Sequence, residues 1–163
     1  MTKLRGLFRL SASDWITLMA AYCWLFRARR TMQALRSGGW QTAINPERPA
    51  SPETGDVTCR LTAPQIQRRV RFIRLAARYP KPWALCLQRS LALREWLERD
   101  QVFTELRIGV YRDDQQFLAH AWLEQHGNII NDHPNWVRKF TLLPTERGSN
   151  FEPILGLLGE ARQ

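Results

Sequence analysis

Three residues that lie far apart in the sequence, Cys86, His120 and Asp132, carry the side chains of an activated thiol nucleophile. In such a site a thiolate attacks a carbonyl carbon, a histidine moves the proton, and a carboxylate orients the histidine. Taken singly, each residue has an ordinary structural explanation: a small buried thiol, a strand histidine and a strand-end acid. Together, in the order Cys, His, Asp, they predict acyl transfer from an amide.

Cys86 is predicted to lie in the first turn of a helix, because Pro80 and Pro82 precede it in the segment PKPWAL. The unpaired amides and the positive dipole end of a helix favour thiolate over thiol and so lower the pKa of a cysteine there. The predicted helix covers residues 85–99. Its inward-facing positions are predicted to include Leu85, Leu93, Trp96 and Leu97.

An alternating apolar pattern after residue 100 predicts three strands, Glu105–Tyr111, Phe117–Gln125 and Asn128–Asp132, with the first two joined by residues 112–115. His120 and Asp132 are twelve residues apart, and an even separation permits direct pairing across a hairpin. This pairing requires a three-residue loop, 125–127, with a left-handed Gly127. Directly opposed Cβ atoms lie about 4.5–5.5 Å apart, so a His120–Asp132 hydrogen bond is predicted.

Two helices are predicted before Cys86. One runs from about Asp14 to Arg36, after the capping residues SASD, and contains the apolar run Trp15–Phe26. The other runs from Thr62 to Tyr79, opened by Thr62 and Pro64. Its apolar residues Ile66, Val70, Ile73 and Ala77 recur every three or four positions. Helices followed by an antiparallel meander predict an α+β fold.

The composition is that of one globular domain: 163 residues, 44% hydrophobic, 24% charged and a net charge of +9. We divide the chain into an apolar and basic helical segment (1–44), a proline-rich linker (45–60) and a catalytic domain (61–163). The three widely spaced cysteines favour a reducing cytoplasm. The apolar run is twelve residues long, short of the roughly 18–20 that span a bilayer. Because Arg27, Arg29 and Arg30 follow it, it is interpreted as retained and not as a cleaved signal.

Four segments closely resemble the lasso-peptide maturation proteases, which are transglutaminase-like leader peptidases: CLQRSLAL (86–93), IGV (108–110), FLAHAWLE (117–124) and ND (131–132). The resemblance implies a transglutaminase-like or papain-like cysteine protease core, with no cofactor and no metal. It makes Cys86 the nucleophile, His120 the general base and acid, and Asp132 the residue that orients His120. The expected reaction is attack of Cys86 at the leader–core junction, giving a thioester that water hydrolyses.

Many members of that family carry an N-terminal recognition domain with strands, whereas the first 60 residues here offer one apolar helix and a linker. The chain is therefore interpreted as the stand-alone protease half. The resemblance then implies three partners: the lasso-peptide precursor with its leader and core, a separate leader-recognition protein, and an ATP-dependent lasso cyclase.

Several residues near the predicted nucleophile are candidates for supporting roles. The Cys86 backbone N–H is a natural oxyanion donor, and Trp83 and Gln67 are candidates for a second. Ser90 lies one turn beyond Cys86, where its hydroxyl can reach a carbonyl or a neighbouring strand. Trp122 shares the strand face of His120 and is predicted to shield the site or to pack in the core.

Alternatives to the peptidase remain open. A metal site built from Cys59, Cys86, His120, His126, Asp132 and His133 matches no zinc spacing. The main non-enzyme alternative is a basic, non-catalytic module for nucleic acid or a partner, suggested by the arginine-rich helix 65–78, although no nucleic-acid motif accompanies it. The first helix is predicted to pack on the protease core or on a partner protein, and weak membrane association through it is left open.

Overall fold

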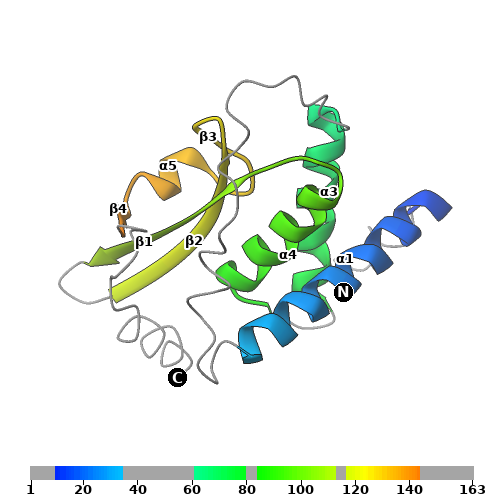
Figure 1. Ribbon diagram of the computed structural model, residues 1–163, viewed down its shortest axis with the longest axis horizontal. Helices are drawn as coiled ribbons and strands as arrows, with labels where there is room; N and C mark the ends of the chain where they lie inside the picture. The colour runs from blue at the N-terminus through cyan, green and yellow to red at the C-terminus, as the bar shows by residue number, and fades with distance from the viewer. Residues whose placement is uncertain (1–9, 35–60, 80–83, 113–116, 144–163) are drawn as a thin grey trace, which may run out of the picture.

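The computed structural model of the protein describes residues 10–34, 61–79, 84–112 and 117–143. The helices are α1 (Ala12–Ala34), α3 (Ala63–Arg78), α4 (Cys86–Arg99) and α5 (Pro134–Val137), and the strands are β1 (Glu105–Arg112), β2 (Phe117–Gln125), β3 (Asn128–Ile129) and β4 (Thr141–Leu142). Three long helices precede the sheet, so the fold is α+β as predicted (Figure 1). The predicted linker and most of the predicted β1–β2 connection lie outside the described residues.

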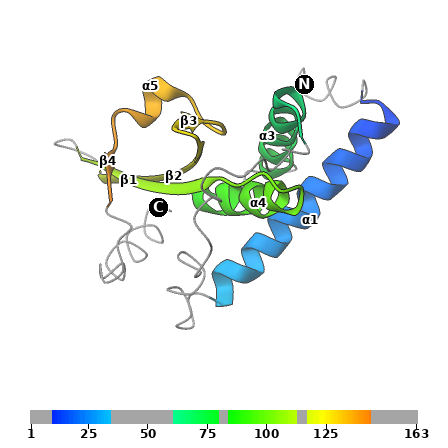
Figure 2. The same cartoon turned by 45° about the horizontal axis from the view of Figure 1, so that its top comes forward.

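The four strands form one antiparallel sheet in the order β3-β2-β1-β4. The β1–β2 pair is its centre, with a register that runs from Glu105 opposite Glu124 to Arg112 opposite Phe117. Figure 2 shows α1, α3 and α4 grouped on one side, with α5 apart from them. The sheet therefore separates two packing layers.

Helix α1 begins with a reciprocal cap. The Ser11 Oγ accepts a hydrogen bond from the Asp14 N–H at 3.2 Å, and the Asp14 carboxylate accepts one from the Ser11 N–H at 3.1 Å. The helix consequently starts at Ala12, two residues before the predicted Asp14. Its predicted end at Arg36 lies outside the described residues.

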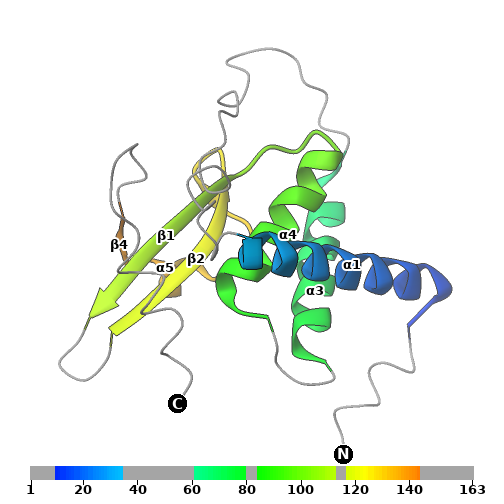
Figure 3. The same cartoon turned by 60° about the horizontal axis from the view of Figure 1, so that its bottom comes forward.

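One stripe of α1 packs against α3 and α4, which it crosses in Figure 3. The buried residues of this stripe are Leu18, Ala21, Leu25 and Ala28, spaced three and four apart. Packing on the core is thus confirmed for this stripe, whereas Trp15, Ile16, Met19 and Phe26 are exposed. None of the described helices is long and apolar enough to cross a membrane.

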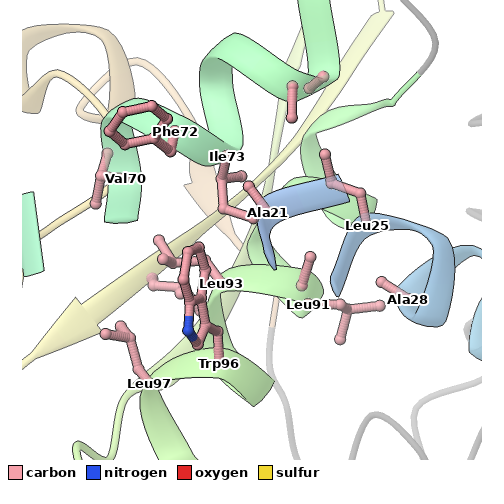
Figure 4. Close-up of a cluster of buried hydrophobic side chains, with 14 of the residues drawn as sticks. Ala21, Leu25, Ala28, Val70, Phe72, Ile73, Leu91, Leu93, Trp96 and Leu97 are labelled. Carbon is pink, nitrogen blue, oxygen red and sulfur yellow. The ribbon is translucent and has the colours of Figure 1, made fainter. Parts of the chain in front are cut away.

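The main core lies where the three helices meet the inner face of the sheet. Figure 4 shows residues of α1, α3 and α4 in this cluster, among them Leu25, Ile73 and Leu93. Helix α3 starts after Thr62, whose N–H donates to the Gln65 side chain at 2.7 Å, and its four predicted inward residues are buried.

Helix α4 buries Leu93, Trp96 and Leu97 as predicted, but Leu85 is 45% exposed, so its predicted inward position is wrong. Leu85 is the N-cap, and its extended backbone (φ −74°, ψ 169°) takes it off the helical stripe.

A second, smaller cluster covers the outer face of the sheet. Its buried members are Trp122, Val137 and Phe140, with Tyr111, Leu118 and Ile129 packed against them. Successive strand residues point to opposite faces, so Trp122 joins this cluster while Ala121 and Leu123 join the main core.

Candidate active site

The turn between β2 and β3 differs from the prediction by one residue. Glu124 pairs with Ile129 and Gln125 with Asn128, which leaves a two-residue loop of His126 and Gly127. Both have positive φ, 49° and 75°, as in the tight turns that match strand twist. The left-handed Gly127 is confirmed. The three-residue loop is wrong, because His126 also adopts a conformation that favours Gly, Asn or Asp.

The predicted contact between His120 and Asp132 is present, although its predicted geometry is not. The His120 Nε2 lies 2.7 Å from the Asp132 Oδ2. Strand β3 ends at Ile129 and not at Asp132, and the two residues are not cross-strand partners. The chain leaves the sheet and returns over His120, where the His133 N–H donates to the Asp132 Oδ1 at 2.8 Å.

Cys86 is the first residue of α4, as predicted, and its thiol is partly buried. The side chain of His120 and the backbone amides of Ala121 and Leu87 act on the thiol and lower its pKa against the effect of burial. The Nε2 of His120 is hydrogen-bonded to Asp132, so Nδ1 is the ring nitrogen available to the Cys86 thiol. The structure therefore brings all three predicted residues together.

The shortness of β3 explains how α4 reaches the sheet. Strand β3 pairs only with Glu124 and Gln125, so the β2 edge is open at Ala121. Helix α4 approaches that edge at one residue, because the Ser90 Oγ donates to the Ala121 carbonyl at 3.0 Å and the backbone amide of Ala121 lowers the pKa of the Cys86 thiol. The predicted reach of Ser90 to a neighbouring strand is confirmed.

The electrostatics of the site favour an ionised pair of Cys86 and His120. Burial alone would raise the pKa of the Cys86 thiol, but the hydrogen bond and charge of His120, with the Ala121 and Leu87 amides, lower it below its ordinary value. Burial alone would lower the pKa of His120, but hydrogen bonds and charges of Asp132 and Cys86 raise it to about 9. A thiolate beside an imidazolium is the reactive form of a nucleophilic cysteine.

The pKa of Asp132 is lowered although burial opposes this. The hydrogen bonds from His120 and from the His133 N–H stabilise the carboxylate, and the charges of His120 and Arg74 add to them. Asp132 is therefore ionised at neutral pH, as a residue that orients an imidazolium must be.

Asn131 joins the three elements that supply the site. Its Nδ2 donates to the Ser90 Oγ at 2.9 Å, and its Oδ1 accepts from the Leu123 N–H at 2.8 Å. Ser90 is fully buried. Asn131 was named from the sequence only as a neighbour of Asp132, because the partners of its half-buried side chain come from other elements and no local pattern indicates them.

A cleft of about 400 Å³ opens at Cys86, His120 and Asp132. Helix α3 contributes Arg74, whose guanidinium donates to the Asn131 carbonyl at 2.6 Å, and α4 contributes Arg89. The remaining described lining residues are mostly apolar or aromatic: Val70, Ile73, Leu93, Ala121, His133 and Trp136, with Ser90 and Asn131. The cleft is thus lined by α3 and α4 on one side and by β2, the Asp132 loop and Trp136 of α5 on the other.

Aromatic rings fix the orientation of His120. Its ring stacks on Trp122 at a centroid distance of 6.2 Å and also contacts Phe140 at 5.3 Å and Trp136 at 6.4 Å. Core packing and shielding of the site were the two roles predicted for Trp122. Because Trp122 is 1% exposed and stacks on the His120 ring, one contact serves both roles.

Other predicted residues do not join the site. The Gln67 amide donates to the Ile130 carbonyl at 3.4 Å and does not line the cleft, so its prediction as an oxyanion donor is wrong. Trp83 and Cys59 lie outside the described residues, and His126 is an exposed turn residue. Within the described ranges, no three His, Cys, Asp or Glu side chains gather where they could hold a metal ion.

Comparison with known proteins identifies a family and a partial relative. The sequence profile of the transglutaminase-like superfamily matches residues 22–145. A segment of 58 residues is 38% identical to the microcin J25-processing protein McjB of Escherichia coli, and it covers 36% of this chain and 27% of that protein. The match therefore spans about a quarter of that relative. No solved structure matches the chain.

Proposed function

The chain belongs to the transglutaminase-like superfamily, and on that premise we propose that it is a cysteine peptidase that removes the leader from a lasso-peptide precursor. The observation that carries the proposal is the contact of His120 Nε2 with Asp132 Oδ2 at 2.7 Å, on a histidine that also hydrogen-bonds the Cys86 thiol at a helix N-terminus. Nucleophile, base and orienting acid are thus within one cleft.

The reaction proceeds in two steps. The Cys86 thiolate attacks the carbonyl carbon of the scissile amide, and the His120 imidazolium gives its proton to the leaving nitrogen as the C–N bond breaks. A thioester of Cys86 remains. Water then attacks it, His120 takes the proton of that water, and the thiolate leaves with restoration of the imidazolium. Asp132 holds the ring in place throughout.

The Cys86 backbone N–H stabilises the oxyanion in both steps. It lies at the start of α4, where amide groups have no partner within the helix. One such donor is typically worth about 10²–10³ in rate.

The substrate class comes from the relative, whose name describes it as a processing protein for microcin J25. We propose a precursor of the same kind for this chain, delivered by a separate leader-recognition protein and passed to an ATP-dependent cyclase. The proposed compartment is the cytoplasm, where a reducing environment keeps the Cys86 thiol free.

The non-catalytic alternative, a basic binding helix, is weakened by the ion pairs of α3. Arg68 pairs with Asp14 at 2.8 Å and Arg69 with Asp100 at 2.6 Å, so these two charges are already partly neutralised. Phosphate binding would need free cations along one face of the helix.

The first test needs no substrate. The native protein is alkylated with iodoacetamide from pH 5 to 9, and modification of Cys23, Cys59 and Cys86 is quantified separately by peptide mass spectrometry, for the wild type and His120→Ala. We expect Cys86 to react fastest, with an apparent pKa that is depressed and that rises in the variant. An inert Cys86, or one that behaves like the exposed Cys23 regardless of His120, would refute the ion pair.

The second test uses cleavage. A candidate lasso-peptide precursor is incubated with a leader-recognition protein and the wild-type chain, and the released leader is measured by mass spectrometry. Cys86→Ala should abolish cleavage. Cys23→Ala is the matched control, because this exposed cysteine lies on α1 and does not line the cleft, so cleavage should be unchanged.

A further inference from the structure

Arg89 is a cation in the cleft that the proposed mechanism does not use. It follows Cys86 by three residues on α4, lines the cleft and is partly buried. Its guanidinium makes no hydrogen bond or ion pair with any residue that the structure describes. Other arginines of the helices do have carboxylate partners: Arg27 with Glu95, Arg69 with Asp100, and Arg94 with Glu98. A half-buried guanidinium whose donors have no partner among the described residues is a ready site for a carboxylate.

The cleft offers Arg89 no acid of its own. Asp132 is the one carboxylate among the described lining residues, and both of its oxygens are engaged, Oδ2 with His120 and Oδ1 with the His133 N–H. Arg74 lines the same cleft and bonds a backbone carbonyl, that of Asn131, and not a carboxylate. The imidazolium of His120 balances one of the two anions, the Cys86 thiolate and the Asp132 carboxylate. The two guanidiniums, of Arg74 and Arg89, then face one remaining anion, so the cleft has an excess of positive charge.

The wall around Arg89 strengthens its attraction for an anion. Val70 and Ile73 of α3 and Leu93 of α4 line the cleft and are buried. Apolar walls lower the local dielectric, so a charge pair formed there is worth more than the same pair at an open surface.

We propose that Arg89, supported by Arg74, forms a carboxylate subsite beside Cys86, so that the peptide cleaved here carries an Asp or Glu side chain next to the scissile bond. This inference rests on the proposed function, because it assigns the cleft to a peptide. Arginine suits the task because its planar fork pairs with both carboxylate oxygens.

Two alkylating reagents test the subsite without a substrate. Iodoacetate and iodoacetamide place the same reacting carbon and the same leaving iodide at the sulfur, and they differ in that iodoacetate carries a carboxylate. The measured quantity is the ratio of their rates at Cys86, with the ratio at Cys23 as an internal reference. The charge of His120 also affects this ratio, but His120 is present in every variant compared, so its contribution is the same in each.

The wild type should show a higher ratio at Cys86 than at Cys23. Arg89→Gln should lower the Cys86 ratio about three- to tenfold, as expected for loss of one nearby charge, because the iodoacetate rate falls more than the iodoacetamide rate. Arg89→Lys should keep most of the preference. Arg30→Gln is the matched control, since Arg30 is exposed on α1 and does not line the cleft. Added salt should reduce the preference in the wild type more than in Arg89→Gln.

Each contrary outcome has a separate meaning. An unchanged ratio in Arg89→Gln overturns the subsite, while the pH dependence of iodoacetamide still decides the peptidase. An equal fall of both rates in Arg89→Gln shows a structural role for Arg89 and also overturns the subsite. A wild-type Cys86 that reacts with neither reagent overturns both proposals.

Discussion

The imidazole of His120 and the carboxylate of Asp132 meet at 2.7 Å although the two residues are not paired in the sheet. Their contact depends on a loop that leaves the β2 edge after Ile130, whose N–H donates to the Leu123 carbonyl at 3.1 Å. Orientation of the histidine is therefore a property of this loop, and of the groups that hold it, more than of the strand ladder. The predictions below test those groups one at a time.

Asp132→Asn removes the charge that holds the imidazolium and leaves the shape of the side chain nearly unchanged. We expect the pKa of His120 to fall and that of Cys86 to rise, since each is shifted by the other. Cleavage should fall by about 10²–10⁴-fold, the range for loss of an orienting acid or of acid–base catalysis. The pH profile of Cys86 alkylation measures the shift. A variant with an unaltered profile would show that Asp132 does not act on the pair.

The pH dependence of activity follows from His120, whose pKa is raised from 6.5 to about 9. Cleavage should decline as pH rises through about 9, because the imidazolium is then lost. The free energy of unfolding changes in the same direction. Because the pKa of His120 is raised in the folded state, its protonation stabilises that state fully below about pH 6.5, and this contribution is lost as pH rises through about 9. Urea unfolding of the wild type and His120→Gln from pH 6 to 10 measures it, and their difference should shrink toward high pH.

Asn131→Leu tests the link among Ser90, β2 and the Asp132 loop. The substitution leaves the Leu123 N–H without its partner, at a cost of about 1–3 kcal/mol in the free energy of unfolding. It should also loosen Asp132, so that Cys86 reactivity falls at pH 7. Asn128→Ala is the control, because Asn128 is exposed and its side chain donates to the nearby His126 carbonyl at 3.3 Å, away from the Asp132 loop. Equal effects of the two changes would contradict a positioning role for Asn131.

Gly109→Ala tests the aromatic support of His120. A Cβ there would lie 2.9 Å from both the Phe140 Cβ and the Trp122 Cη2. We expect destabilisation of about 1–3 kcal/mol from overpacking. Alkylation of Cys86 should also be slower, because the His120 ring stacks on Trp122.

Gly127→Ala is the matched control for this prediction. It is strained by its φ of 75°, but a Cβ there meets nothing within 4 Å. It should lower stability and leave the alkylation rate of the folded protein unchanged. Slower alkylation in this variant as well would assign the Gly109 effect to general destabilisation.

Leu25→Ala tests whether α1 belongs to the core. Leu25 is fully buried, so its truncation should cost about 2–5 kcal/mol. Ile16→Ala on the same helix, at a residue that is 73% exposed, should change stability by no more than about 0.5 kcal/mol. Thermal or urea unfolding of both variants measures the difference. Similar small effects would mean that α1 is an attachment and not a part of the core.

The elements that position the site were predictable because their signals are local. The Thr62–Pro64 start, the spacing of Ile66, Val70 and Ile73, and the prolines before Cys86 each act within one or two turns. The contact of His120 with Asp132 was also predicted, but from a direct cross-strand pairing that the structure does not contain.

The remaining features depend on tertiary structure. The left-handed conformation of His126 has no sequence signal of the Asn-Gly kind, so the register was displaced by one residue. The role of Asn131 requires Ser90 and Leu123 to be in place, and these come from other elements. The exposure of Leu85 follows from an N-cap backbone that periodicity alone does not indicate.

The two packing clusters have a consequence for how the protein could lose activity. Cys86 packs against the large helical cluster, whereas the His120 ring rests on Trp122 and Phe140 of the small outer one. Small units with few buried residues open at lower free energy than the global transition. Sub-global opening of the outer cluster would separate the imidazole from the sulfur while the helices stay folded. Heat or mild denaturant would then lower the reactivity of Cys86 reversibly, before helical circular dichroism reports any unfolding.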